Sequence, residues 1–293
     1  MLFTTDFLAQ LYHRAAHYDA NNEFASEDYN DLKKIGYYKA LVPKEYGGLG
    51  LSLKEMVRHQ TQLAMVAPAT ALGINMHQII VGMAKHMVKF GNTKGEQILR
   101  DAVNDHLLAF AISEASNDRV LFGSICQAKP DENQGYHFYG EKVFLSMAKQ
   151  CDHLVTYATD STGESPLSIF AYLDNSSDTI VTKDDWNTLG MRATQSHTTI
   201  LNGAYASEEK ILTKLAPGPN FNPVVFGIFA YFEIFLAATY FGIGKRALEI
   251  GIETVKSRQS IANQTTYDQD KNIRWRIAEA AITLEGIQAQ IDQ

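Results

Sequence analysis

The spacing of apolar residues changes twice along the chain, and this order limits the fold more than any single motif does. Up to residue 107, apolar side chains recur at helical spacing, as in Leu8 and Leu11. From Leu107 onward, short runs rich in β-branched and aromatic residues alternate with clusters of Gly, Asp, Asn and Ser, which is typical of strands and turns. The helical period then returns, and Asn222 and Pro223 predict an N-cap followed by the first helical residue.

The sequence therefore predicts an α+β protein of three domains. They are an N-terminal α-helical domain, a central β-barrel or sandwich-like domain and an incomplete C-terminal helical bundle, in residues 1–107, 108–220 and 221–293. Hydrophobic residues make up 45% of the 293 positions and charged residues 20%, which is typical of a soluble globular protein with a sizeable core.

Charge and cysteine content narrow the classes of partner and compartment. A formal net charge of −7 argues against a nucleic-acid partner, although a local cation such as Lys142, Arg192 or Arg258 can still hold a phosphate. Cys126 and Cys151 are too few for a disulfide framework and are not spaced as a redox pair. Together with an N-terminus that lacks the pattern of a secretory signal, this predicts a cytoplasmic protein.

Residues 224–244 form an apolar run of about 21 residues, long enough to cross a membrane. Its single charge is Glu233, and a carboxylate near the middle of a span costs roughly 2.5 to 3.5 kcal/mol on insertion scales. The run continues into the charged stretch Lys245–Glu249 as a soluble helix would. We therefore predict a helix buried on all faces inside a bundle, and no membrane span.

Metal and hydrolase chemistry find little support in the sequence. His13 and His17 have the i, i+4 spacing of two zinc ligands, but no glutamate lies between them and no third ligand is evident, so we predict a solvated helix and no metal site. No Gly-x-Ser-x-Gly elbow occurs. The glycine-rich stretch 43–50 lacks the Lys-Ser or Lys-Thr of a phosphate loop and predicts an interhelical loop.

Two short segments of the central domain carry the strongest functional signal: Gly140–Ala148 and Leu189–His197. Each combines a turn glycine, a strand-like apolar residue and closely spaced hydroxyl groups. Such a combination can place backbone and side-chain donors against a flat ring that is rich in heteroatoms.

In this order and spacing the two segments resemble the β-domain of the acyl-CoA dehydrogenase family of flavoproteins. The resemblance implies that Phe110, Ile112 and Ser113 belong to the strand whose backbone and hydroxyl bond the flavin ring. Phe144 stands where the family usually has a tryptophan that shields the ring. Ser146 stands where it usually has a threonine that donates toward flavin N5.

The resemblance extends to the rest of an FAD site. Asn117 stands at the serine of a glycine-rich turn that contacts cofactor phosphate and substrate, although the turn is shorter here. The family also takes part of its FAD site from a neighbouring subunit, and the matching residues are Arg258, Ser260 and Gln269. Ile261 and Ala262 replace the usual phenylalanine and glycine of that motif. A solvated helix-end cation is the alternative interpretation of Arg258.

The family reaction needs a carboxylate in an apolar pocket to remove an α-proton from an acyl thioester. Most members carry this glutamate in closing helices beyond the position of Gln293, and a minority carry it on the first helix of the last domain, where Glu233 is the candidate. An ungapped alignment places Phe232 there, and a one-residue gap restores Glu233. The alternative is a buried carboxylate paired with Lys245 or Arg246.

The sequence thus predicts an FAD-dependent acyl-CoA dehydrogenase-like oxidoreductase of fatty acid metabolism. Its expected partners are an acyl-CoA substrate, an electron-transferring flavoprotein and further copies of itself, as a dimer or tetramer. A flavin-dependent monooxygenase of the same fold and a non-catalytic binding or assembly protein remain alternatives. Because two closing helices alone would leave apolar faces uncovered, a fragment or truncated form is favoured over a short protein that pairs these helices in an oligomer.

Overall fold

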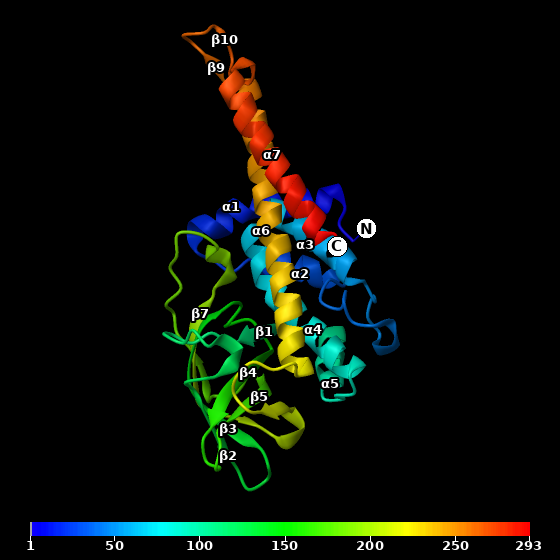
Figure 1. The fold of residues 1–293 in the computed structure, drawn as a ribbon, viewed down its shortest axis with the longest axis vertical. Coiled ribbons are helices and arrows are strands. Elements are labelled where there is room, and N and C mark those ends of the chain that lie inside the picture. Colours follow the sequence, from blue (N-terminus) through cyan, green and yellow to red (C-terminus); the bar gives the residue numbers. More distant parts are fainter. Residues whose placement is uncertain (1) are drawn as a thin grey trace.

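The first hundred residues form a helical body, in agreement with their helical periodicity (Figure 1). The computed structural model describes residues 2–293. The helices of this body are α1 (Thr5–Asn21), α2 (Ser26–Lys34), α3 (Leu53–Val66), α4 (Pro68–Lys89) and α5 (Gly95–Val103). The stretch 43–50 is the predicted interhelical loop and contains one short 3-10 turn, η1 (Lys44–Tyr46).

The central residues form one mixed sheet of eight strands. The strands are β1 (Leu108–Ala111), β2 (Gln127–Pro130), β3 (Tyr136–Leu145), β4 (His153–Asp160), β5 (Leu167–Asp174), β6 (Ile180–Thr182), β7 (His197–Ala206) and β8 (Ile211–Leu215). Their order is β6-β7-β3-β2-β4-β5-β8, and β1 adds to β4 in parallel. The long antiparallel pairs are β3–β7 and β4–β5. The predicted fold class is therefore confirmed.

Gly140 lies inside a strand and not in the turn that the sequence predicts. It belongs to β3, has a φ of +140° and lies just after a register shift between β3 and β7. A Cβ at this position would lie 2.3 Å from the Cys126 Sγ atom. The glycine is thus required by the close approach of a neighbouring side chain and by a backbone angle that other residues rarely adopt.

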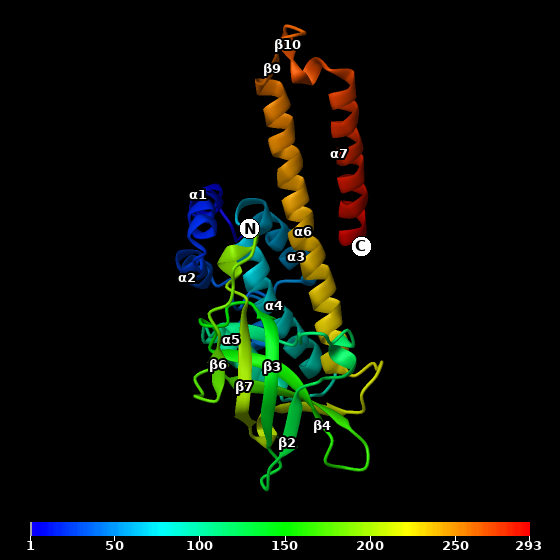
Figure 2. The same cartoon turned by 90° about the vertical axis from the view of Figure 1, so that its left-hand side faces the viewer.

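The chain closes with two long helices that project from the body as a hairpin (Figure 2). They are α6 (Pro223–Ser257) and α7 (Lys271–Ile291), joined by the two-residue strands β9 (Gln259–Ser260) and β10 (Thr265–Thr266) and by the 3-10 turn η5 (Tyr267–Gln269). The predicted start of α6 is confirmed, since the Asn222 side chain accepts a hydrogen bond from Val224 N at 2.9 Å and Pro223 is the first helical residue.

The prediction that the apolar run of α6 is buried on all faces is wrong. The helix packs on α3 and α4, where Gln60 Nε2 donates to Thr239 Oγ1 at 3.2 Å and Thr61 Oγ1 donates to the Ala238 carbonyl at 3.3 Å. The rest of its surface is only partly covered, by α7 and the β-domain, and Phe226 and Tyr240 are about half exposed. By length and composition alone α6 could cross a membrane, but the core helices of soluble proteins share these properties. Of the most apolar stretch of α6, 44% is buried inside the structure.

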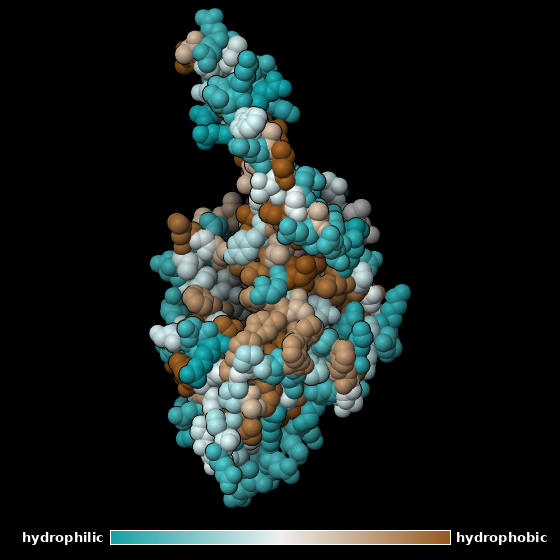
Figure 3. All heavy atoms as spheres, viewed as in Figure 1, coloured by the Kyte–Doolittle hydropathy of each residue, from teal (hydrophilic) through white to brown (hydrophobic). Residues whose placement is uncertain are grey.

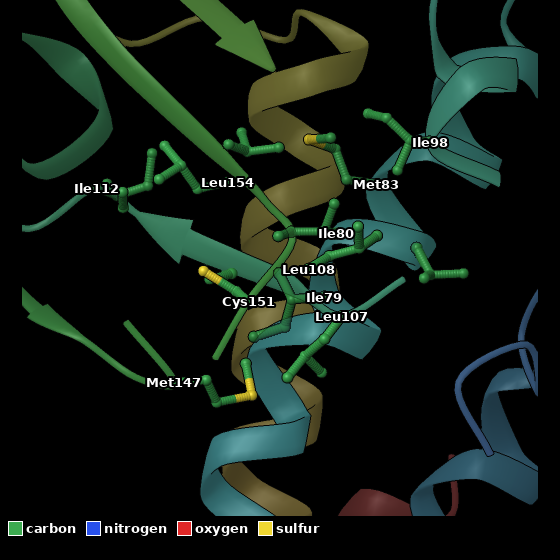
Figure 4. Close-up of a cluster of buried hydrophobic side chains, with 14 of the residues drawn as sticks. Ile79, Ile80, Met83, Ile98, Leu107, Leu108, Ile112, Met147, Cys151 and Leu154 are labelled. Atoms are coloured by element: carbon green, nitrogen blue, oxygen red, sulfur yellow. The ribbon is translucent and has the colours of Figure 1, made fainter. Parts of the chain in front are cut away.

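The helical body meets the sheet along α4, whose apolar residues pack on β1 and β4 (Figure 4). The fully buried His77 of α4 fixes this contact: its Nδ1 accepts from Leu108 N at 3.1 Å, so its Nε2 donates to the Tyr38 carbonyl at 2.8 Å. Burial lowers the pKa of His77 to about 4. The imidazole is therefore neutral near pH 7 and serves as a fixed link between the two layers.

Apolar surface gathers in the middle of the molecule around the helices, whereas the hairpin tip and the far end of the sheet are mostly hydrophilic (Figure 3). On α7 no residue is buried. Trp275 and Ile282 are 68% and 72% exposed. The two closing helices thus leave apolar side chains uncovered in one chain, as the sequence predicts.

Candidate functional site

A cavity of about 670 Å³ opens between the β-domain, α4 and α6. Six of the residues predicted to bind flavin or act as base line it, namely Phe110, Ile112, Ser113, Phe144, Ser146 and Glu233. These residues come from β1 with its following residues, the end of β3, and α6. The structure thus brings together the predicted residues of three separate segments.

Three hydroxyl groups form a connected row on the wall of the cavity. Ser146 Oγ lies 2.9 Å from Ser196 Oγ, and Ser196 Oγ lies 2.7 Å from Thr194 Oγ1. They meet because Leu145 at the end of β3 pairs with His197 at the start of β7. Thr194 Oγ1 donates to the Met191 carbonyl at 2.8 Å.

The proton count of this row fixes its polarity. Each hydroxyl has one proton to donate. Because Thr194 donates to Met191, Ser196 must donate to Thr194 and Ser146 must donate to Ser196. Ser146 then offers lone pairs to the cavity. To donate into the cavity, as the resemblance predicts for this position, it must give up its bond to Ser196.

An aromatic pair and strained backbone mark the mouth of the cavity. The Phe144 ring is 66% exposed and meets Trp186 edge to face, with ring centroids 6.3 Å apart. Phe144, Met191 and the β-branched Val120 all line the cavity and have φ values between +51° and +58°. Positive φ at non-glycine residues costs about 1–3 kcal/mol each and is concentrated at functional sites. The rest of the fold therefore holds this rim in place.

The loop Trp186–Gln195 is fastened to the end of α1. Asn22 Nδ2 donates to the Trp186 carbonyl at 2.7 Å, and Gln195 Nε2 donates to the Asn22 carbonyl at 2.8 Å. Arg192 donates from Nε to the Asp19 carbonyl at 2.8 Å and from a terminal nitrogen to the Thr188 carbonyl at the same distance. The guanidinium proposed as an anion holder is thus largely used in positioning this loop.

A buried ion pair supports the segment that follows β1. Lys142 and Glu114 have fully buried side chains, and Lys142 Nζ lies 2.5 Å from Glu114 Oε1. Glu114 also accepts from Ser124 Oγ and, at 2.8 Å, from Ile125 N. Burial by itself raises the pKa of Glu114, but Lys142 and these donors outweigh it and lower the pKa to about 2.

This pair corrects two expectations from the sequence. Lys142 is enclosed and neutralised by Glu114, so it is not available to a phosphate. Asn117 does not line the cavity: its amide donates to Glu114 Oε2 at 2.6 Å and to the Gly123 carbonyl at 2.9 Å. Its visible role is to fasten the segment that carries Val120 and Leu121 to the cavity wall.

Glu233 lines the cavity but is exposed in the single chain. The alternative of a buried carboxylate paired with Lys245 or Arg246 is wrong. In the part of the chain that the structure describes, no cation lies within 4.0 Å of Glu233, and Arg246 pairs with Glu249 and Glu253. Phe232 also lines the cavity, so the ungapped alignment and the alignment with a one-residue gap both place a residue of this site at the position of the base.

Arg258, Ser260 and Gln269 lie at the tip of the hairpin and not at this cavity. Arg258 is 18 residues beyond Tyr240, the last cavity-lining residue of α6, which corresponds to roughly 27 Å along a helix. Ser260 and Gln269 line a separate hollow of about 280 Å³. Within one chain they do not meet the other predicted residues. Their predicted contact with the FAD of a neighbouring subunit stays a prediction.

Several cavity residues were not identified from the sequence. Leu72 and Met76 of α4 have no polar or catalytic mark, so no pattern distinguishes them from core residues. Ile228, Phe229, Leu236 and Tyr240 could have been found, since with Phe232 and Glu233 they recur every three to four residues on one face of α6.

Comparisons with known proteins agree with this architecture. Residues 4–100 match the family described as acyl-CoA dehydrogenase, N-terminal domain. FMN-bound TdsC from Paenibacillus sp. A11-2 superimposes with a TM-score of 0.84 at 19% identity, over 98% of this chain and 73% of that chain. The chain therefore shares the fold of that structure over nearly its whole length.

The curated relatives of the chain include both a dehydrogenase and a monooxygenase. The glutaryl-CoA dehydrogenase of Desulfococcus multivorans is 25% identical over 252 residues, 84% of this chain and 63% of the relative. The dibenzothiophene monooxygenase of Mycolicibacterium goodii is 25% identical over 247 residues, 80% of this chain and 57% of the relative. The chain carries the N-terminal domain of the acyl-CoA dehydrogenase family in residues 4–100 and has the fold of that family. It spans between about half and two thirds of the length of the curated relatives that it matches first.

Proposed function

We propose that this chain is a flavin-dependent oxidoreductase whose flavin ring lies in the cavity between the β-domain and α6. The observation that carries the proposal is the hydroxyl row of Ser146, Ser196 and Thr194, which opens on an apolar cavity beside Phe144 and Trp186. A volume of about 670 Å³ lies within the range of roughly 300–1,000 Å³ for cofactor and ligand pockets.

The residues present fit a flavin. Apolar walls from α4 and α6 suit the faces of a flat ring, and the hydroxyl row suits its polar edge. We propose FAD, in line with the resemblance to acyl-CoA dehydrogenases, although FMN is the flavin of the similar TdsC structure. Absorption near the flavin bands, followed by mass analysis of the cofactor released on denaturation, distinguishes FAD, FMN and an apoprotein. The last result would favour a non-catalytic binding or assembly protein.

For the reaction, we propose the α,β-dehydrogenation of an acyl-CoA thioester with Glu233 as the base. Glu233 is the one carboxylate among the described residues that line the cavity. When bound, the flavin supplies a two-electron acceptor for the hydride of the substrate β-carbon. Glu233 would take the α-proton, and Phe229 and Phe232 would exclude water from the acyl chain. Since Glu233 is exposed in one chain, the thioester or a second subunit must cover it to raise its basicity.

The second candidate is a flavin-dependent monooxygenase, and the exposure of Glu233 favours it. The other lining residues are apolar or carry hydroxyl, indole or thioether groups, so no desolvated base faces the cavity. Such a lining suits an apolar substrate whose oxygenation requires reduced flavin and molecular oxygen. The similarity to dibenzothiophene monooxygenase supports this alternative.

One pair of assays separates the two reactions. In the first, a series of acyl-CoA thioesters is added to the flavin-loaded protein without oxygen, and bleaching of the flavin is followed. In the second, product formation is measured with oxygen and an added flavin reductase. Glu233→Gln should abolish the bleaching, while Glu285→Gln, which removes an exposed carboxylate of α7 outside the cavity, should leave it unchanged. Bleaching at the wild-type rate in Glu233→Gln would exclude Glu233 as the base.

Further parts of this proposal concern partners. We propose an electron-transferring flavoprotein as electron acceptor, a cytoplasmic location and a homo-oligomer. The uncovered Trp275 and Ile282 of α7 support association between copies. So does the position of Arg258, which is too far along α6 to reach the cavity of its own chain.

A further inference from the structure

A second cluster of chemically active side chains lies where α5 meets the β-domain. Asp101 is in the last turn of α5, His106 is in the loop to β1, and His153 is the first residue of β4. His106 Nδ1 lies 2.9 Å from His153 Nε2. Asp101 Oδ1 lies 3.8 Å from His106 Nδ1, and Asp101 Oδ2 lies 3.9 Å from His153 Nε2. None of the three residues lines the flavin cavity.

These separations are close to those of ligands on one metal ion. Zinc holds histidine nitrogen and carboxylate oxygen at about 2.0–2.2 Å in a tetrahedron, which places neighbouring ligand atoms about 3.3 Å apart. The two histidine nitrogens, 2.9 Å apart, are slightly closer than that value. The separations of 3.8 and 3.9 Å lead to different oxygens of Asp101, Oδ1 and Oδ2, and one ligand atom from each of the three residues lies within 4.8 Å of the others. Side-chain rotation that draws one Asp101 oxygen toward both nitrogens would place three ligand atoms around one ion.

The surroundings hold these ligands as a metal site requires. Asp101 is 9% exposed at its side chain, and its oxygens accept from Tyr172 OH at 2.9 Å and from Gln97 Nε2 at 2.8 Å. Among the described residues no Lys or Arg lies within 4.0 Å of this buried carboxylate. Supporting hydrogen bonds of this kind orient the ligands of known metal sites.

His153 is prepared for the same role. Its Nδ1 atom is buried without a hydrogen-bond partner, and Asp174 Oδ1 lies 3.9 Å away, beyond hydrogen-bond distance. A small approach of Asp174 would give this nitrogen the carboxylate partner that metal-bound histidines commonly have.

We propose that Asp101, His106 and His153 bind one divalent zinc ion. The side chain of His106 is 42% exposed, so the fourth coordination position is accessible to water. The ion would join the end of α5 to the first residue of β4, and its role would be to hold the helical body on the sheet. This assignment is independent of the flavin chemistry, because it shares no residue with the cavity.

The test is a titration of the full chain, stripped of metal by a chelator, with Zn²⁺ and with Co²⁺ as a spectroscopic probe. We expect one equivalent per chain, visible Co²⁺ absorption of a site with nitrogen and oxygen ligands, and a higher thermal midpoint with Zn²⁺. His106→Ala removes a half-exposed ligand and should weaken binding by at least about a hundredfold. The double variant His13→Ala/His17→Ala removes an exposed histidine pair of α1 and should bind as the wild type does.

Two results would overturn the assignment. One is the absence of stoichiometric binding in the wild-type chain, which would leave His106 and His153 as a simple hydrogen-bonded pair. The other is unchanged affinity in His106→Ala. If His106→Ala does not fold, His106→Gln gives the same comparison, and the wild-type titration decides the question without any variant.

Discussion

Lys142→Met tests whether the Glu114–Lys142 pair holds the cavity wall. The substitution removes the cation and leaves the Glu114 carboxylate buried among Ser124 Oγ, Ile125 N and the Asn117 amide. Removing one partner of a buried pair costs about 3–5 kcal/mol. The lowered pKa of Glu114 points in the same direction despite burial, because Lys142 is the largest of the groups that favour its charged form. We therefore expect a loss of about 3–5 kcal/mol.

Urea unfolding at pH 7 measures this loss, and a matched control lies one residue away along the same strand. Glu141 pairs with Lys183 at 2.7 Å, but both side chains are more than 40% exposed. Lys183→Met should therefore cost less than about 1 kcal/mol. The double variant Glu114→Gln/Lys142→Met removes both charges and should recover part of the loss. Equal losses in Lys142→Met and Lys183→Met would refute the argument.

The same pair predicts the response to acid. Because the folded-state pKa of Glu114 lies below its unfolded value, its contribution to stability is complete above about pH 4.5 and is lost as the pH falls toward about 2. The difference in unfolding free energy between wild type and Glu114→Gln should therefore shrink across this window. A constant difference from pH 5 to pH 2.5 would contradict the assignment.

Two further substitutions probe the close approach of α4 to α6 and the hydroxyl row. A Cβ at Gly82 would lie 2.3 Å from the Tyr231 ring, so Gly82→Ala should lower the free energy of unfolding in urea by about 1–3 kcal/mol. Gly251→Ala is the control and should not destabilise the fold, because a Cβ at Gly251 would meet no atom within 4 Å. Ser196→Ala removes the middle hydroxyl of the row and frees the Ser146 proton to donate into the cavity. We expect the free energy of unfolding to fall by about 1–3 kcal/mol and the flavin absorption band to shift. An unchanged spectrum would count against the proposed position of the ring.

Periodicity and cap residues were enough to predict the order of helical body, sheet and closing helices. The Asn222–Pro223 start of α6 depends only on neighbouring residues, and the structure shows it as predicted. The residues of β1 and β3 that we propose for the flavin site could be selected because their segments keep their order and spacing, and they line one cavity.

The errors have a common physical origin, since they depend on contacts between residues distant in sequence. Gly140 looks like a turn residue until Cys126 is seen against it, and Lys142 looks like a free cation until Glu114, 28 residues earlier, is found beside it. Likewise, Glu233 was expected to be buried because its neighbours are apolar. Only the packing of α3 and α4 on one side of α6 shows that Glu233 lies on the other side, at the open cavity, where it is exposed.

The length of α6 determines which part of the helix is packed against the body and which part extends beyond it. Its 35 residues make a rod of roughly 52 Å, held by Gln60 and Thr61 at Thr239 and Ala238. The cavity-lining residues of α6 lie before or beside this point, and that half of the helix is packed on α4, with Tyr231 against Gly82 and Gly227 against Met83. The half beyond it extends about 27 Å to the hairpin tip and packs on α7. The wall of the cavity is therefore held along its length, and bending of α6 is confined to the half that carries Arg258.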